Sequence, residues 1–174
     1  ASWPKRMSPL AGPLREPELE LVEEIDPVRR AQLFVQLAEL WEQRIGSLEE
    51  ASRNLREAAA AQPQDAGLLL SAADACAHVG HGELALRYAQ AALPLCSDGA
   101  QRSRAQRAIA HLHERLEQHD AAVFSLNETA SEHPAEAWPH ERLALIAEER
   151  DQLALAKAHL RAAAHANRVR APRR

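Results

Sequence analysis

The sequence LLLSAADACAHVGHGELALRYAQAALPL, residues Leu68 to Leu95, contains two helical patterns that meet at Gly80-His81-Gly82. In each half, small or aliphatic residues recur three and four positions apart, which is the spacing of one face of an α-helix. Alanine dominates these faces, so two antiparallel backbones can approach closely without the helix penalty of glycine. The pattern therefore predicts a helical hairpin. Its facing residues are expected to be Leu69, Ala72, Ala73, Cys76, Ala85, Ala89 and Ala92.

The composition of the 174-residue chain favours stacked helices over a compact aromatic core. Apolar residues make up 46% of the chain and charged residues 26%, as in ordinary globular proteins, but aromatic residues make up only 3%. Alanine-rich helices can close their interfaces without large aromatic side chains. The formal net charge of −4 argues against a general polyanion binder. We therefore do not expect nucleic acid as a partner, since only the few arginines of the C-terminal tail would support it.

The cysteine content and the hydropathy pattern suggest a location. Cys76 and Cys96 are too few for a disulfide framework, and we interpret both as reduced thiols of a cytoplasmic protein. No apolar run approaches the roughly 20 residues that a membrane span needs, and the Pro-rich start lacks the apolar centre of a signal peptide. We expect no association with a membrane.

The hairpin pattern occurs four times. The small residues of the second helices align at Ala51, Ala85, Ala122 and Ala156, which are 34, 37 and 34 residues apart. The first helices keep the same phase through the pairs Leu37-Ala38, Ala72-Ala73, Ile109-Ala110 and Leu143-Ala144. A period kept across four units predicts an all-α fold of about eight helices.

The repeats divide the chain into three segments. Residues 1–27 contain five prolines and are expected to form an extended arm, with a short amphipathic turn around Leu21 and with Trp3 as an anchor. Residues 28–167 form the expected repeat domain, and residues 168–174 form a basic tail. The four repeats are expected at about residues 28–63, 64–97, 98–134 and 135–167.

The repeated pattern resembles the tetratricopeptide repeat (TPR). The signature positions of the first unit are Phe34, Leu37, Ala38, Trp41, Ala51, Leu55, Ala58 and Pro63. The resemblance covers about residues 28–167, with an extra residue near Ile45-Gly46, a longer linker at Ser97 to Ala100, and polar Gln106 and His140 where large apolar residues are usual. It implies a right-handed superhelical solenoid of antiparallel hairpins whose first helices line a concave groove. It also implies protein or peptide binding rather than catalysis.

The middle of the expected groove is basic. Four residues that fall three or four apart share one helical face and could bind carboxylates: Arg104, Arg107, His111 and Arg115. We therefore expect an acidic peptide or protein segment as the partner. The alternative is a solvated charged face that pairs with Glu114 or Glu117. The remaining expected groove residues are Leu70, Asp74, Trp138 and Arg142.

Trp138 begins a helix, where it could anchor a partner or could instead pack on the preceding hairpin. The nine histidines do not suggest a metal site. His111 and His113 are two apart on a predicted helix and point about 200° apart, so they cannot bind one ion. His78 and His81 flank a turn without an acidic or thiol partner at ligand spacing. With no phosphate loop, zinc-protease motif or nucleophile setting, we expect no metal, no cofactor and no enzymatic activity.

The leading hypothesis is a non-catalytic adaptor or scaffold that holds a protein segment in its concave groove. The second hypothesis is structural. The fourth hairpin continues into the basic tail without a polar cap helix, so Leu153 and Leu155 are expected on an apolar outer face. A further repeat, another copy of the chain or a neighbour's arm could cover that face, which would give a homo-oligomer or a subunit of a larger complex.

Overall fold

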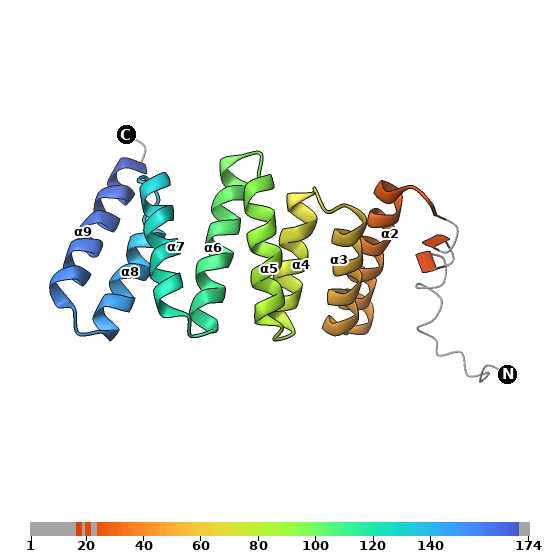
Figure 1. Ribbon diagram of the computed structural model, residues 1–174, viewed down its shortest axis with the longest axis horizontal. Helices are drawn as coiled ribbons and strands as arrows, with labels where there is room; N and C mark the ends of the chain where they lie inside the picture. The colour runs from red at the N-terminus through yellow and green to blue at the C-terminus, as the bar shows by residue number, and fades with distance from the viewer. Residues whose placement is uncertain (1–16, 19, 22–23, 171–174) are drawn as a thin grey trace. The chain divides into compact units, whose positions relative to one another are not determined.

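The computed structural model of the chain describes residues 17–18, 20–21 and 24–170, except for the side chain of Arg170. These ranges are mostly helical and contain no strand. Between residues 24 and 170, eight α-helices form four consecutive hairpins (Figure 1). Their bounds are α2 Pro27–Leu40, α3 Leu48–Ala61, α4 Ala66–His78, α5 Gly82–Ala92, α6 Gly99–Arg115, α7 His119–Glu132, α8 Trp138–Glu149 and α9 Leu153–Arg170. The prediction of an all-α helical repeat with about eight helices is confirmed.

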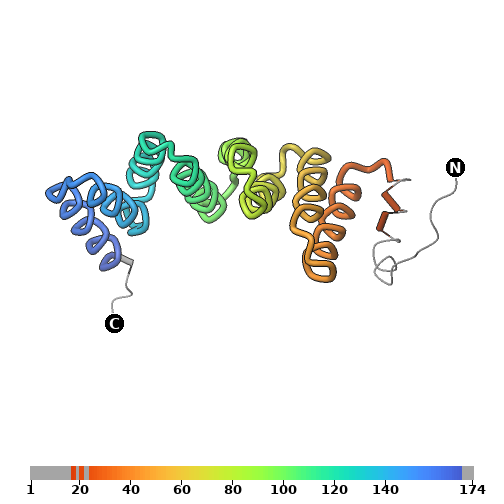
Figure 2. The backbone as a smooth tube through the Cα atoms, turned by 90° about the horizontal axis from the view of Figure 1, so that it is seen from below, coloured from red at the N-terminus to blue at the C-terminus, as the bar shows by residue number. Residues whose placement is uncertain are grey.

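The chain forms two compact units, one that ends at Gln101 and one that begins at Arg102. Unit 1 contains α2 to α5, with α3 packed on both α2 and α4, and with α4 also packed on α5. Unit 2 contains α7, α8, α9 and most of α6, and α8 packs on both α7 and α9. The two helices of each hairpin run side by side in the tube view (Figure 2). None of the helices in the described ranges combines the length and the apolar character that crossing a membrane requires.

Only part of the expected arm can be compared with the structure. Pro17, Glu18, Glu20 and Leu21 have helical backbone, and they lie where a short amphipathic turn is expected within the arm. Trp3, most of the arm and the last residues of the basic tail lie outside the described residues. The limits expected for the arm, the repeats and the tail remain predictions.

Each hairpin turns through one residue with left-handed backbone. The φ angles are 74° at Gly46, 86° at Gly80, 57° at Glu117 and 56° at Asp151. These residues are 34, 37 and 34 positions apart, the same spacings that separate the repeat alanines. In the last three hairpins, the N–H after the turn residue donates to the carbonyl five residues earlier, at 2.8 to 2.9 Å. The four turns are therefore equivalent points of one repeated unit.

The first hairpin accommodates one more residue than the others. Trp41–Ile45 continues α2 as a π-helical segment, and the turn hydrogen bond runs from the Ser47 N–H to the Trp41 carbonyl at 3.0 Å. This bond spans six residues instead of five because the wider π-helical turn holds the additional residue. The extra residue expected near Ile45-Gly46 is thus accommodated in the π-helical segment.

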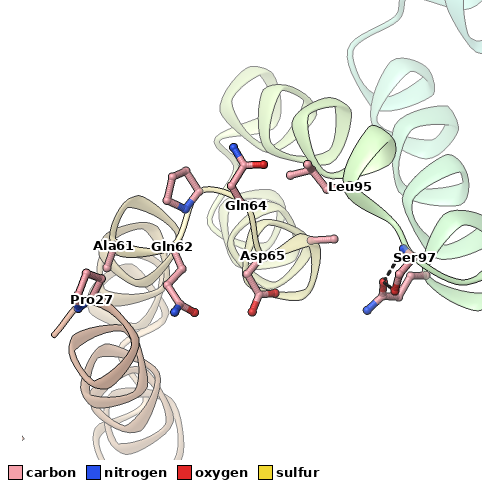
Figure 3. A pocket seen from close by; sticks show the side chains of 10 residues that line it. Pro27, Ala61, Gln62, Gln64, Asp65, Leu95 and Ser97 are labelled. Atoms are coloured by element: carbon pink, nitrogen blue, oxygen red, sulfur yellow. Dashed lines mark hydrogen bonds between the residues drawn. The ribbon is translucent and has the colours of Figure 1, made fainter.

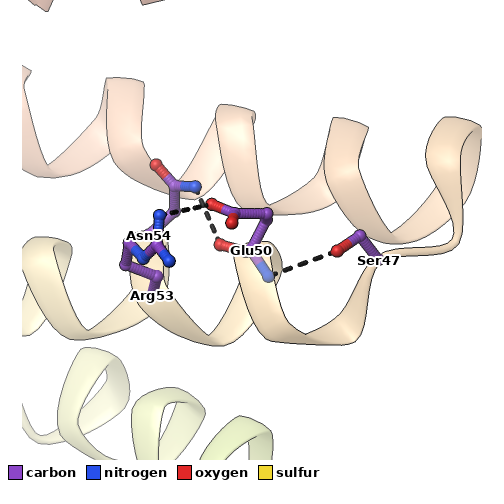
Figure 4. Close-up of polar contacts among 4 residues, drawn as sticks. All are labelled: Ser47, Glu50, Arg53 and Asn54. Carbon is purple, nitrogen blue, oxygen red and sulfur yellow. Dashed lines mark hydrogen bonds and ion pairs between the residues drawn. The ribbon is translucent and has the colours of Figure 1, made fainter.

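Polar side chains fix the start of α3 directly after this turn. Ser47 Oγ accepts a hydrogen bond from the Glu50 N–H at 3.4 Å (Figure 4). The Glu50 carboxylate pairs with Arg53 at 2.9 Å, and Asn54 Nδ2 donates to the Glu50 carbonyl at 2.8 Å. A serine cap of this kind stabilises a helix by about 1 kcal/mol. The cap therefore locks the position at which the second helix of the hairpin begins.

Small residues close the hairpin interfaces. The repeat alanines Ala51, Ala85, Ala122 and Ala156 are at most 4% exposed. The aligned first-helix pairs are also buried, as the repeat pattern predicts. Alanine at these positions leaves room for the backbone of the facing helix. Cys76 and Cys96 are buried and are not joined by a disulfide.

Candidate functional site

The four basic residues predicted on one helix face do share the exposed side of α6. These residues are Arg104, Arg107, His111 and Arg115. The opposite side of the helix is buried through Ala105, Ile109 and Leu112. The i, i+3 and i+4 spacing aligns the basic residues along the helix axis. Together with Arg142 of α8, we call this surface the basic face.

A polar cluster joins α6 to the start of α8. The guanidinium of Arg107 lies 4.7 Å from the centroid of the Trp138 ring and 3.9 Å from the Glu136 carboxylate. Glu136 also accepts hydrogen bonds from Ser103 Oγ at 2.9 Å and from Trp138 Nε1. One carboxylate therefore orients both the cation and the aromatic ring of the basic face.

A second contact between the same two helices involves Arg142. Its Nε donates to Glu114 of α6 at 3.2 Å, and its Nη2 donates to the other carboxylate oxygen. The hydrogen bond with Glu114 raises the pKa of Arg142, which stays charged at any physiological pH. This pair links residues 28 positions apart in the sequence.

The carboxylates of these two contacts are less exposed than the arginines. The side chains of Glu114 and Glu136 are 17% and 27% exposed, whereas those of Arg142 and Arg107 are 46% and 60% exposed. In both pairs the guanidinium group is therefore more accessible to solvent than the carboxylate that it contacts.

Trp138 is half-buried and packs against the buried residues Ala110, Leu126 and Leu143. This placement matches the alternative in which the ring packs on the preceding hairpin, although the residue remains partly exposed and the guanidinium of Arg107 lies over its ring.

The expectation that Leu70 lines a groove is wrong. Leu70 is 1% exposed and belongs to the core of unit 1. Because α4 contacts both α3 and α5, its buried side is wider than a single helix face, and Leu70 falls within it. Asp74 is half-buried on the same helix. Leu70 and Asp74 belong to unit 1, whereas the other predicted residues belong to unit 2.

Unit 1 has a groove of its own between α2 and α4, with a volume of about 470 Å³. Its lining residues are Val28, Ala31, Gln32, Val35, Gln36, Gln62, Asp65 and Leu68. Aliphatic side chains and glutamine amides alternate along it, and an amide can both donate to and accept from a peptide backbone. Sequence reasoning missed this groove. The sequence feature that indicates it is the pair Gln32 and Gln36, which are four residues apart and lie beside Val28 and Val35 on one helix face.

A second hollow of about 610 Å³ opens at the helix ends of unit 1. It lies between Pro27, the loop after α3 and the segment from Leu95 to Gln101. The side chains of Gln62 and Asp65 point the same way there, away from that of Gln64 (Figure 3). Gln62 and Asp65 also line the groove between α2 and α4, so the two hollows share a wall.

The two polar residues at usually apolar repeat positions have partners on the second helix of their hairpin. Gln106 is 6% exposed, and its Nε2 donates to Glu132 of α7 at 2.6 Å. His140 of α8 faces His159 of α9. Within the part of the chain that the structure describes, no group of three or more His, Cys, Asp or Glu residues is arranged to hold a metal ion.

No family model and no curated protein matches this sequence. Solved structures with a similar fold include MamA, with 16% identity, a TM-score of 0.71, and coverage of 91% of this chain and 89% of that chain. Residues 41 to the end of MamA from Desulfovibrio magneticus RS-1 give 14% identity, a TM-score of 0.64, and coverage of 95% and 99%. YrrB, described as a TPR protein with an unusual peptide-binding site, gives 16% identity, a TM-score of 0.64, and coverage of 90% and 81%. The repeated hairpins, their equivalent left-handed turns and these structural neighbours together show that the chain has the fold of the tetratricopeptide repeat proteins.

Proposed function

We propose that the chain is a non-catalytic protein-interaction scaffold, and that its basic face binds an acidic segment of another protein. The observation that carries this proposal is the basic face itself, in which Arg107 and Arg142 are more exposed than the carboxylates that they contact. Guanidinium groups form bidentate hydrogen bonds with carboxylates, so a glutamate or aspartate side chain is the natural complement.

Apolar groups beside the arginines support a protein partner over a simple anion. The Trp138 ring is partly exposed, and Leu145, three residues after Arg142 on α8, is 47% exposed. An anchor residue of the partner could bury these groups while its acidic neighbours pair with arginine. The preferred segment would therefore combine acidic residues with a large apolar side chain.

The groove of unit 1 supports the same class of function. Its aliphatic and amide lining suits an extended polypeptide, whose backbone groups need hydrogen-bond partners when they leave water. YrrB, which has the same fold, is a peptide-binding protein. Two buried cysteines that do not form a disulfide support a reducing compartment, and we propose that the scaffold is located in the cytoplasm.

The test is the binding of short fluorescent peptides in which glutamates flank a leucine, measured by anisotropy. We expect saturable binding that weakens about tenfold or more when Arg104, Arg107 and Arg115 are all changed to glutamate. Peptides with lysine in place of glutamate should not bind. The matched control changes Arg44, Arg87 and Arg161, which are exposed on other surfaces, to glutamate. Full affinity of the first triple variant, with helicity unchanged, would refute the site.

A second candidate function is assembly through the last hairpin. Four large apolar side chains of α9 are exposed: Leu153 at 63%, Leu155 at 47%, Leu160 at 49% and Val169 at 62%. Leu160 occupies the repeat position at which Ala89 and Leu126 are fully buried. Sedimentation equilibrium tests this candidate. Self-association that disappears in the Leu153→Glu/Leu160→Glu variant would support it, and a monomer at high concentration would exclude self-assembly.

A further inference from the structure

One exposed side of α9 combines leucines with cationic residues. Among the described helices, only α8 makes an extensive contact with α9. Six exposed residues of α9 are related by steps of three or four positions and therefore share one side of the helix. We call this surface the α9 stripe, and it consists of Leu153, Lys157, Leu160, Arg161, Ala164 and Arg168.

In earlier hairpins, the positions of the stripe contact the first helix of the next hairpin. Lys157 corresponds to Ser52 of the first hairpin, whose hydroxyl lies 3.6 Å from a thiol of α4. Leu160 corresponds to Leu126 of the third hairpin, which is fully buried in a cluster with Leu143 of α8. The repeat therefore indicates what the stripe can pack against, namely a helical segment that presents aliphatic side chains.

The charge of the stripe indicates what else that segment must carry. The helix α9 contains no acidic residue, whereas the stripe contains a lysine and two arginines. At the position of Lys157, the three earlier hairpins have uncharged residues: Ser52, Leu86 and Val123. A segment that packs on the stripe therefore needs acidic residues beside its aliphatic ones. Two copies of the stripe do not suit each other, because their cations would meet in the contact.

A segment of this kind precedes α2 in the same chain. Residues 17–26, with the sequence PELELVEEID, contain five acidic residues, four aliphatic residues and no basic residue. The Glu24 N–H donates to the Glu20 carbonyl at 3.0 Å, as in a helical turn. Leu21 and Ile25 are four residues apart, and Ile25 is 90% exposed. We call residues 17–26 the acidic arm segment.

We propose that the acidic arm segment of one copy packs on the α9 stripe of a second copy, where it takes the place of a following first helix. This proposal rests on assembly through the last hairpin, the second candidate function above, and it names both surfaces of the contact. Because the two surfaces differ, the contact joins copies head to tail and not about a two-fold axis. Within one chain Glu20 pairs with Arg29 at 3.2 Å, but both side chains are about half exposed, so this pair can be exchanged at little cost.

The test is sedimentation equilibrium of the full chain without an affinity tag. We expect self-association that weakens about tenfold or more in the arm variant Glu18→Gln/Glu20→Gln/Ile25→Gln. The stripe variant Leu153→Gln/Leu160→Gln should weaken it by a similar factor, because it removes the apolar part of the other surface. Both variants change exposed or partly exposed side chains and should keep their helicity. Added salt should weaken the association of the unmodified chain, because opposite charges meet in the contact.

A mixture of the two variants tests the head-to-tail arrangement directly. The stripe variant keeps an intact arm, and the arm variant keeps an intact stripe. The mixture should therefore form a complex of one copy of each, although neither variant associates alone. The matched control neutralises three exposed glutamates on other surfaces through Glu42→Gln/Glu128→Gln/Glu148→Gln and should associate like the unmodified chain.

The outcomes separate this proposal from the candidate function on which it rests. Self-association that is lost in the stripe variant but unchanged in the arm variant would overturn the proposal and leave assembly through the last hairpin intact. A mixture of the two variants that stays monomeric would also overturn the head-to-tail contact. An unmodified chain that is monomeric at high concentration would overturn both, and the stripe would then be left to a segment of another protein.

Discussion

The guanidinium of Arg107 lies 4.7 Å from the centroid of the Trp138 ring, and both groups interact with the carboxylate of Glu136. The ring packs on the hydrophobic cluster of unit 2 below and supports a cation above. Stability of the hairpins and presentation of the basic face therefore depend on the same side chain.

Replacement of Trp138 by alanine should destabilise unit 2 by about 2–3 kcal/mol, somewhat less than for a fully buried tryptophan. Phenylalanine retains most of the ring packing, so Trp138→Phe should lose less than half as much. Urea denaturation followed by circular dichroism measures both variants. A loss from Trp138→Ala below about 0.5 kcal/mol would show that the ring contributes little to packing.

Substitutions at two of the turn residues should change the stability of the chain in opposite directions. Glu117 has left-handed backbone, which glycine adopts without strain, so Glu117→Gly should stabilise the chain by about 0.5–1 kcal/mol. Gly80→Ala should destabilise it by about 1–2 kcal/mol. A Cβ on Gly80 would meet no atom within 4 Å, so this loss would report backbone strain alone. If the two variants shifted the urea midpoint in the same direction, the equivalence of the turns would be contradicted.

Two ion pairs should differ in their effect on stability because they differ in burial. Glu114→Gln removes the charge that Arg142 contacts through two hydrogen bonds and should cost about 1 kcal/mol. Asp120, which pairs with Arg150 at 3.5 Å, has a fully exposed side chain. Asp120→Asn should produce no measurable change in the same denaturation experiment. Similar losses in the two variants would mean that burial does not distinguish these pairs.

The stability of the last hairpin should fall in acid. Because burial and His140 lower the pKa of His159 in the folded chain, the unfolded chain binds the proton at a higher pH. The stabilisation is complete above the ordinary histidine value of about 6.5 and is lost as pH falls toward the folded pKa. His159→Gln should therefore reduce the difference between urea midpoints measured at about pH 7.5 and about pH 5.5. An unchanged difference in the His159→Gln variant would contradict this prediction.

The fold followed from the sequence because it depends on local periodicity. The spacing of Ala51, Ala85, Ala122 and Ala156 predicts the repeat, and the structure places equivalent turns at the same intervals. Helix–helix contacts in such a fold are made mostly between neighbours in the chain, so a short pattern that recurs in phase is sufficient.

The details of the surface depend on contacts that periodicity does not encode. Glu136 and Glu114 reach arginines of other helices, and His159 meets a residue 19 positions away. Such pairs depend on side-chain rotamers and on the packing of one hairpin against the next. The prediction that Leu70 lines a groove is wrong for a related reason. Helices pack on two sides of α4, so more of its surface is buried than its amphipathic pattern indicates.

The π-helical segment Trp41–Ile45 shows how one hairpin of the array can contain an additional residue. Its bulge stores one inserted amino acid inside α2, while Gly46 still makes the turn and Ser47 still caps the next helix. An insertion at this point leaves the register of every later hairpin untouched. Single-codon gains and losses can therefore be tolerated within helices, and repeat units of unequal length can coexist in one chain.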